Sequence, residues 1–254
     1  MKAIVLTSTG YRHRYFASAI AKHFEVLAVI TEEKKNYYTT QREESLLVQE
    51  HFKRLSESEK KWFENIEESD VPPSTLVSDI NSEETLKWAK SLGADCICLF
   101  GTAILKSNWI EAFSDKIINL HLGLSPYYRG SATLFWPFAF RELEFLGTTI
   151  HLAIEKVDAG AILHRVQPKF VSGDDYYAVT NRLIRDSIDL VASVTKKYLD
   201  GSVTPKQQES VSGRLCKKAD FSEEALNRML DYVGDGLSQS EIARIEDKRC
   251  HYSL

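Results

Sequence analysis

The fold is decided by the stretch Ile118-Asn119-Leu120-His121-Leu122-Gly123-Leu124-Ser125-Pro126-Tyr127-Tyr128-Arg129-Gly130. Its apolar start predicts a buried strand, on which residues 119 and 121 point to the same face. A carboxamide and an imidazole therefore leave the carboxyl end of this strand together, where open α/β sheets bind their ligands. The glycines and the proline behind the pair predict a turn-rich loop whose backbone can approach a ligand.

A second motif, Asp158-Ala159-Gly160, follows an alternating strand expected at residues 149–154. With Asn119 and His121 it places a carboxylate, a carboxamide and an imidazole at the ends of two strands. An imidazole exchanges protons near neutral pH, and an amide donates hydrogen bonds without titrating. The combination indicates proton transfer beside a developing oxyanion. The alternative is that the three are ordinary polar residues at strand ends.

The rest of the chain alternates strands and helices. Buried strands are expected at residues 2–7, 26–30, 75–78, 94–100, 147–154 and 161–168. Helices are expected at residues 15–24, 81–91, 107–113, 132–142 after a Ser131 cap, and 174–199 after an Asp174 cap. This order predicts an α/β fold, a Rossmann-like, doubly wound, mostly parallel sheet with helices on both faces.

Two regions depart from this alternation. Between residues 31 and 70, 18 of 40 residues are charged, which predicts a charged helical insertion with helices at roughly 41–68. The insertion either covers a substrate pocket or is a solvated appendage. We expect a catalytic domain over residues 1–200 and a small C-terminal α+β extension over 201–254. The extension is expected to hold two short strands within 203–217 and helices beginning at Ser222 and Ser238.

Composition excludes several classes of protein. With 254 residues and 43% hydrophobic content, the chain can bury a core without disulfides or metals. The four cysteines lack paired spacing, and no metal site is expected. A net charge of −4 argues against a nucleic-acid partner. No apolar stretch approaches ~20 residues and the N-terminus does not resemble a signal peptide, so we expect a cytoplasmic protein without a membrane partner.

A basic turn joins the first strand to the first helix. It contains Tyr11, Arg12, His13 and Arg14 at the expected N-terminus of that helix. Helix N-termini attract anions, and basic side chains reinforce the attraction. The turn is either a docking point for a phosphate of the substrate or a solvated surface turn.

At Asn119, His121 and Asp158-Ala159-Gly160 the sequence resembles the folate-dependent formyltransferases, whose pattern is Asn-x-His, a Leu-Pro type loop and Asp-x-Gly. The resemblance covers roughly residues 1 to 200. It implies N10-formyltetrahydrofolate as co-substrate and formyl transfer to a primary amine through a tetrahedral carbon. By resemblance, His121 is the base or a protonated oxyanion partner, Asn119 donates to the oxyanion, and Asp158 orients or charge-pairs the imidazole.

The resemblance also implies binding residues. Folate contacts are expected from the loops after two central strands, at Phe100, Gly101, Ile104, Leu105, Ile154 and Val157. Many members have Ser-Leu-Leu-Pro where this chain has residues 123–126, Gly-Leu-Ser-Pro, and the run to Gly130 looks most like the sugar-nucleotide N-formyltransferases. Candidate contacts to the amine substrate are Tyr11, Arg12, His13, Ser125, Tyr127, Tyr128, Arg129 and Trp136.

The resemblance therefore predicts an N-formyltransferase acting on a nucleotide-linked amino sugar, as in lipopolysaccharide or O-antigen precursor synthesis. Its partners would be the two small molecules and a second copy of the chain in a homodimer. Hydroxyornithine, glycinamide ribonucleotide and methionyl-tRNA remain alternative amines. The extension looks short for the C-terminal domain of methionyl-tRNA formyltransferases, and the first loop does not match the glycinamide ribonucleotide phosphate loop. A catalytically silent folate- or nucleotide-binding module is the alternative from another class.

Overall fold

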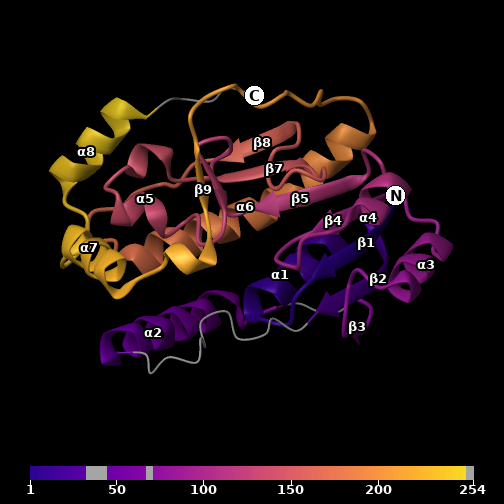
Figure 1. Ribbon diagram of the computed structural model, residues 1–254, viewed down its shortest axis with the longest axis horizontal. Helices are drawn as coiled ribbons and strands as arrows, with labels where there is room; N and C mark the ends of the chain where they lie inside the picture. The colour runs from indigo at the N-terminus through magenta and orange to yellow at the C-terminus, as the bar shows by residue number, and fades with distance from the viewer. Residues whose placement is uncertain (33–44, 67–70, 250–254) are drawn as a thin grey trace.

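A computed structural model describes residues 1–32, 45–66 and 71–249 (Figure 1). Its main sheet has the strand order β3-β2-β1-β4-β5-β7-β8, and β6 pairs with β9 in a second, two-stranded sheet. The strands are β1 (Lys2–Thr7), β2 (Glu25–Glu32), β3 (Ser74–Val77), β4 (Cys96–Leu99), β5 (Ile117–His121), β6 (Tyr128–Gly130), β7 (Thr148–Leu152), β8 (Ile162–Val166) and β9 (Arg214–Cys216). The strands from β3 to β5 are parallel, whereas β7 runs antiparallel to both β5 and β8. The expected mostly parallel α/β fold is confirmed.

Helices cover both faces of the main sheet. They are α1 (Tyr11–Ala21), α2 (Leu46–Phe63), α3 (Glu83–Ser91), α4 (Ser107–Ala112), α5 (Trp136–Ala139), α6 (Tyr176–Leu199), α7 (Glu223–Val233) and α8 (Gln239–Lys248), with short 3-10 turns η1 (Leu143–Phe145) and η2 (Lys218–Asp220). Successive side chains of β1 point to opposite faces of the sheet and so belong to two hydrophobic cores. Ala3 and Val5 pack with α1 and α6 on one face, and Ile4 and Leu6 pack with α3 and α4 on the other.

Several helix starts follow from local chemistry. The hydroxyls of Ser45, Ser82, Ser222 and Ser238 each accept a backbone N–H of the first turn. At α6 the expected cap is wrong by one residue, because Asp175 caps the helix. The carboxylate of Asp174 binds the guanidinium of Arg182 instead.

The helix expected at residues 132–142 is also wrong. Only Trp136–Ala139 forms helix α5, and the chain then continues through η1. Pro137 lies in the first turn of α5, where its missing N–H is tolerated, and it would break a helix begun at residue 132. Ala132 adopts a left-handed φ of 55°, which also excludes a continuous helix from that point.

Helices of the charged region and of the C-terminal region both pack on the helices beside the main sheet. Helix α2 packs against α1 and α6, while residues 33–44 and 67–70 of the expected insertion lie outside the described residues. Helix α7 packs on α5, and β9 pairs with β6. Within the expected strands at 203–217, only β9 and a bridge between Lys206 and Ile162 form. No helix in the described ranges is long and apolar enough to cross a membrane.

Candidate active site

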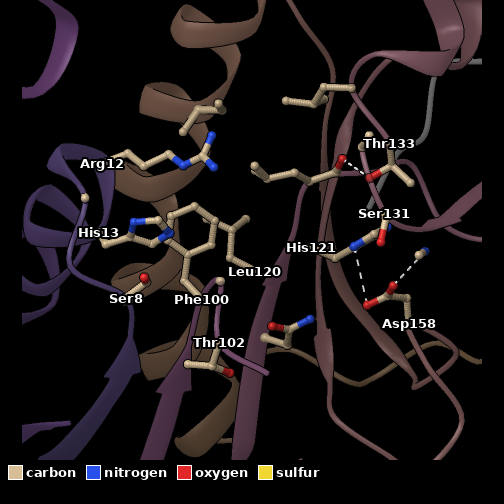
Figure 2. A pocket seen from close by; sticks show the side chains of 18 of the residues that line it. Ser8, Arg12, His13, Phe100, Thr102, Leu120, His121, Ser131, Thr133 and Asp158 are labelled. Atoms are coloured by element: carbon tan, nitrogen blue, oxygen red, sulfur yellow. Dashed lines mark hydrogen bonds and ion pairs between the residues drawn. The ribbon is translucent and has the colours of Figure 1, made fainter. Parts of the chain in front are cut away.

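A cavity of about 840 Å³ opens at the carboxyl ends of β1, β4 and β5. Its lining comes from the loops after these strands, from residues 130–135 and 153–158, and from one face each of α2 and α6. Figure 2 shows its two sides, with Ser8, Arg12, His13 and Phe100 facing His121 and Asp158. The parallel strands therefore deliver the ligand-facing groups to one edge of the sheet, as expected for this fold.

His121 and Asp158 lie next to each other on one side of this cavity. Nδ1 of His121 lies 3.4 Å from Oδ1 of Asp158, and the side chains are 6% and 12% exposed. The opposite nitrogen, Nε2, lies 3.0 Å from the carbonyl oxygen of Tyr128. A carbonyl only accepts hydrogen bonds, so Nε2 carries the proton of the neutral ring. Nδ1 is then the nitrogen that can take up a proton, and it faces the carboxylate.

The carboxylate of Asp158 is held ionised. The backbone N–H of Gly130 donates to Oδ2 at 2.9 Å. Burial by itself would raise the pKa of Asp158, but the imidazoles of His121 and His151 and the Gly130 N–H hold it at about 2. Asp158 therefore presents a negative charge to His121 throughout the neutral range.

The surroundings of His121 favour its neutral form. Burial lowers its pKa from the ordinary 6.5, and the Asp158 carboxylate partly opposes this effect. The ring is therefore uncharged near pH 7, and any proton arriving at Nδ1 forms an ion pair with Asp158. This arrangement is that of a general base with a stabilising partner.

A further histidine, which the sequence did not single out, orients the carboxamide. Nε2 of His151 lies 3.0 Å from Nδ2 of Asn119, and Nδ1 of His151 donates to the Leu152 carbonyl at 2.8 Å. In the tautomer that donates from Nδ1, Nε2 accepts one N–H of Asn119, and the second N–H of that amide is left for a ligand; the same Nε2 lies 3.7 Å from Oδ1 of Asp158. The β5–β7 register pairs Asn119 with His151, but the direction of β7 was needed to find this partner.

The expected folate contacts all line the cavity. These residues are Phe100, Gly101, Ile104, Leu105, Ile154 and Val157. Ile104 and Ile154 are 66% and 44% exposed, respectively, although both are large apolar side chains. Exposed apolar side chains beside backbone carbonyls and N–H groups suit a flat ring with a polar edge, so these residues fit a pterin.

The expected contacts to the amine substrate divide into two groups. Tyr11, Arg12 and His13 line the cavity. Glu59 of α2 faces the same turn, with Oε2 lying 3.6 Å from Nε of Arg12 and Oε1 lying 3.4 Å from its backbone nitrogen. The Glu59 carboxylate therefore neutralises part of the positive charge at the N-terminus of α1.

The second group lies outside the cavity lining. It comprises Ser125, Tyr127, Tyr128, Arg129 and Trp136. The hydroxyl of Tyr128 binds Glu142, Tyr127 stacks on Phe145, and the indole of Trp136 donates to the Ser131 carbonyl. The structure does not bring these side chains into the cavity lining, because nearness in sequence to β5 does not decide which way the loop turns them. Their contact with the amine substrate stays a prediction.

An aromatic wall, defined as His51, Phe52, Phe135, Tyr176 and Phe221, lines the cavity instead. The Phe221 ring lies 5.6 Å from that of Phe52 and 5.3 Å from that of Phe135. Nδ1 of His51 lies 2.8 Å from the Tyr177 hydroxyl, and burial lowers the pKa of His51 to about 4, so the wall is uncharged at neutral pH. Residues from α2, α6 and the C-terminal extension meet here, and no sequence spacing links them.

Over the described ranges 1–32, 45–66 and 71–249, no three His, Cys, Asp or Glu side chains form a group that could hold a metal ion. The chemistry of the site is that of an imidazole, a carboxylate and a carboxamide.

Comparisons with known proteins show what the chain is similar to. A family profile described as formyl transferase matches residues 1–195. A methionyl-tRNA formyltransferase from Synechocystis sp. is 35% identical over 143 residues, which are 55% of this chain and 43% of that protein. The segments matched in the first curated relatives are less than two thirds of those proteins' lengths.

Solved structures share the fold. A sugar N-formyltransferase from Shewanella sp. FDAARGOS_354 superposes with a TM-score of 0.61 at 15% identity, covering 92% of this chain and 88% of that one. A formyltransferase from Anoxybacillus kamchatkensis, in complex with UDP-4,6-dideoxy-4-formamido-L-AltNAc and tetrahydrofolate, gives 0.51 at 17% identity, with 87% of both chains covered.

Proposed function

The chain belongs to the formyl transferase family, and from this premise we propose that it moves a formyl group from N10-formyltetrahydrofolate to the primary amine of a nucleotide-linked amino sugar. The observation that carries the proposal is the convergence of Asn119, His121 and Asp158 on one cavity, with Nδ1 of His121 3.4 Å from the Asp158 carboxylate. The folate supplies an activated formyl carbon, and the chain supplies the proton transfer and the oxyanion contact.

Each residue has a role that follows from its surroundings. The attacking amine loses a proton to Nδ1 of His121, and Asp158 stabilises the imidazolium that results. The second N–H of Asn119 donates to the oxyanion that develops on the formyl oxygen, while His151 keeps the amide in that orientation. His121 then returns the proton to the departing folate nitrogen.

The aromatic wall favours an acceptor with a planar ring. The aromatic wall is uncharged and apolar, and Arg12 is partly neutralised by Glu59. Aromatic side chains bind nucleobases and sugar faces by stacking. The Anoxybacillus kamchatkensis neighbour holds a UDP-linked formamido sugar, which supports a nucleotide sugar as the acceptor class here.

A single-turnover assay tests this function. Purified protein and N10-formyltetrahydrofolate are mixed with UDP-, dTDP- and GDP-linked amino sugars and, separately, with glycinamide ribonucleotide, hydroxyornithine and methionyl-tRNA. We expect tetrahydrofolate release and a formamide product with a nucleotide sugar. Transfer only to one of the other amines would replace the acceptor assignment, and folate binding without transfer to any amine would indicate a silent binding module.

The rate should depend on pH through His121. Burial lowers the pKa of His121 below its ordinary 6.5, so the imidazole is neutral at pH 7. We expect kcat to rise with pH through a limb whose midpoint lies below 6.5 and to stay level from pH 7 to 8. A limb centred above pH 7 would contradict this assignment. Unfolding midpoints measured over the same pH range exclude loss of structure as the cause of the limb.

The aromatic wall should govern acceptor binding. Phe52→Ala removes a ring that lies 5.6 Å from Phe221, and we expect the KM of the amine to rise about tenfold while the KM of folate changes little. Leu46→Ala, on the same helix at a residue 82% exposed, is the control and should leave both constants unchanged. An equal rise in both KM values would show that the wall does not bind the acceptor selectively.

A further inference from the structure

Residues 206–216, here called the strap, lie beyond the segment matched by the family profile. Lys206 exchanges two backbone hydrogen bonds with Ile162 on the edge strand β8, with N···O distances of 2.8 and 2.7 Å. At its other end the strap forms β9, which pairs with β6. Figure 1 shows this orange segment passing from α6 along β8 and then descending as β9.

One side chain of the strap reaches the Asp-x-Gly turn. Nε2 of Gln208 donates to the carbonyl oxygens of Asp158 at 2.8 Å and of Gly160 at 2.9 Å. Both amide hydrogens are therefore used to tie the two ends of the turn together. On the other side the turn presses on β7, since a Cβ at Gly160 would lie 1.7 Å from the Leu152 carbonyl oxygen.

The strap also fixes the position of Gly130, whose N–H donates to the Asp158 carboxylate. The N–H of Ser131 donates to the Cys216 carbonyl at 2.9 Å, and a Cβ at Gly130 would lie 2.2 Å from the same oxygen. This close approach fixes β6, whose Gly130 N–H donates to Oδ2 of Asp158. Backbone and carboxylate of Asp158 are thus both restrained from one segment.

Asp158 needs such restraint. Its φ is +50°, a left-handed conformation that a residue with a Cβ adopts at an energetic cost. A strained residue keeps its geometry only when its surroundings over-determine it. We propose that Gln208 is a positioning residue that fixes Asp158 against His121, so that the strap completes the active site; this inference rests on the proposed function.

Two variants remove the hydrogen-bond donor while keeping the side-chain length. Gln208→Met removes the Gln208 donor from both carbonyls and leaves the Asp158 carbonyl with the longer 3.3 Å hydrogen bond from the Ser125 hydroxyl, whereas Gln208→Glu brings a carboxylate against both oxygens. Gln207→Ala is the matched control, because Gln207 is the adjacent residue and is exposed. We expect the single-turnover rate, normalised to folate-binding sites by titration, to fall about tenfold to a hundredfold in both Gln208 variants, with Gln208→Glu the slower, and to stay unchanged in Gln207→Ala. Rates per site equal to wild type would overturn the proposal, even if the yield of folded protein fell.

A second measurement needs no substrate. The imidazole of His121 is titrated by NMR in wild type, Gln208→Met and Gln207→Ala. The charged or titratable groups acting on this ring are Asp158, which raises its pKa, and His151 and Arg129, which lower it. If Asp158 moves away, the pKa of His121 falls, so we expect a lower value in Gln208→Met alone. An unchanged titration would overturn the positioning role, whereas absence of formyl transfer by wild type would count only against the proposed function.

Discussion

Asp158→Asn is expected to lower the single-turnover rate of formyl transfer about a thousandfold. The substitution preserves size, and the remaining amide oxygen can still accept from the Gly130 N–H. Two functions are lost. The negative charge that stabilises the His121 imidazolium disappears, and the new NH2 group donates to Nδ1, the nitrogen that must take up the proton.

The control for this variant is Asp115→Asn. Asp115 is exposed and shares the left-handed backbone of Asp158, with φ values of 58° and 50°, but it does not line the cavity. We expect Asp115→Asn to retain the wild-type rate and both variants to bind tetrahydrofolate equally in a fluorescence titration. A rate for Asp158→Asn within tenfold of wild type would show that His121 works without a charged partner.

The two polar residues at the end of β5 were predictable from sequence. The period of a strand alone puts Asn119 and His121 on one face, and the apolar residues before them identify the strand as buried. The sequence also indicated the region of Asp158, which follows the strand β7. The turn after β7 brings Asp158 back to the edge of the sheet where Asn119 and His121 lie. The 3.4 Å approach to His121 depends on the cavity side of that turn, which is set by packing against β7 and by the strap.

His151 was not predictable from the same rule. Its importance arises because β7 runs antiparallel to β5, so that residue 151 lies opposite Asn119. An alternating strand has the same sequence pattern in either direction. The aromatic wall was missed for a related reason: His51, Tyr176 and Phe221 come from three segments whose meeting depends on tertiary packing. Nearness in sequence instead pointed to Tyr127 and Tyr128, which the loop turns away.

Two helix starts were predicted wrongly, those of α5 and α6. Pro137 within the expected helix 132–142 already restricts that helix to a start near residue 136. The aromatic residues around it suggested a longer amphipathic stripe, but Phe135, Trp136 and Phe138 are buried whether or not the segment is helical, and Phe140 is 37% exposed. At α6, neighbouring aspartates offered two equivalent caps, and Arg182 decided between them by binding Asp174.

Gly123→Ala is expected to reduce the rate about a hundredfold, although residue 123 itself carries no chemistry. A Cβ at this position would lie 2.4 Å from Nε2 of His121 and 2.6 Å from the Tyr128 carbonyl oxygen, the two atoms whose hydrogen bond fixes the proton on Nε2. The methyl group separates them, so the ring must rotate or shift and Nδ1 moves relative to Asp158. Crowding at Thr133, 2.8 Å away, also lowers the free energy of unfolding by about 1–3 kcal/mol.

Gly93→Ala separates the catalytic effect from the loss of stability. Gly93 has a left-handed φ of +64°, and a Cβ at this position would have no atom within 4 Å, so alanine there costs conformational energy without touching the cavity. We expect both variants to unfold at lower urea concentration than wild type, but only Gly123→Ala to lose rate per folded molecule. Equal rates per folded molecule would mean that the Tyr128 carbonyl does not hold the His121 tautomer, and the assignment of Nδ1 as the basic nitrogen would fall with it.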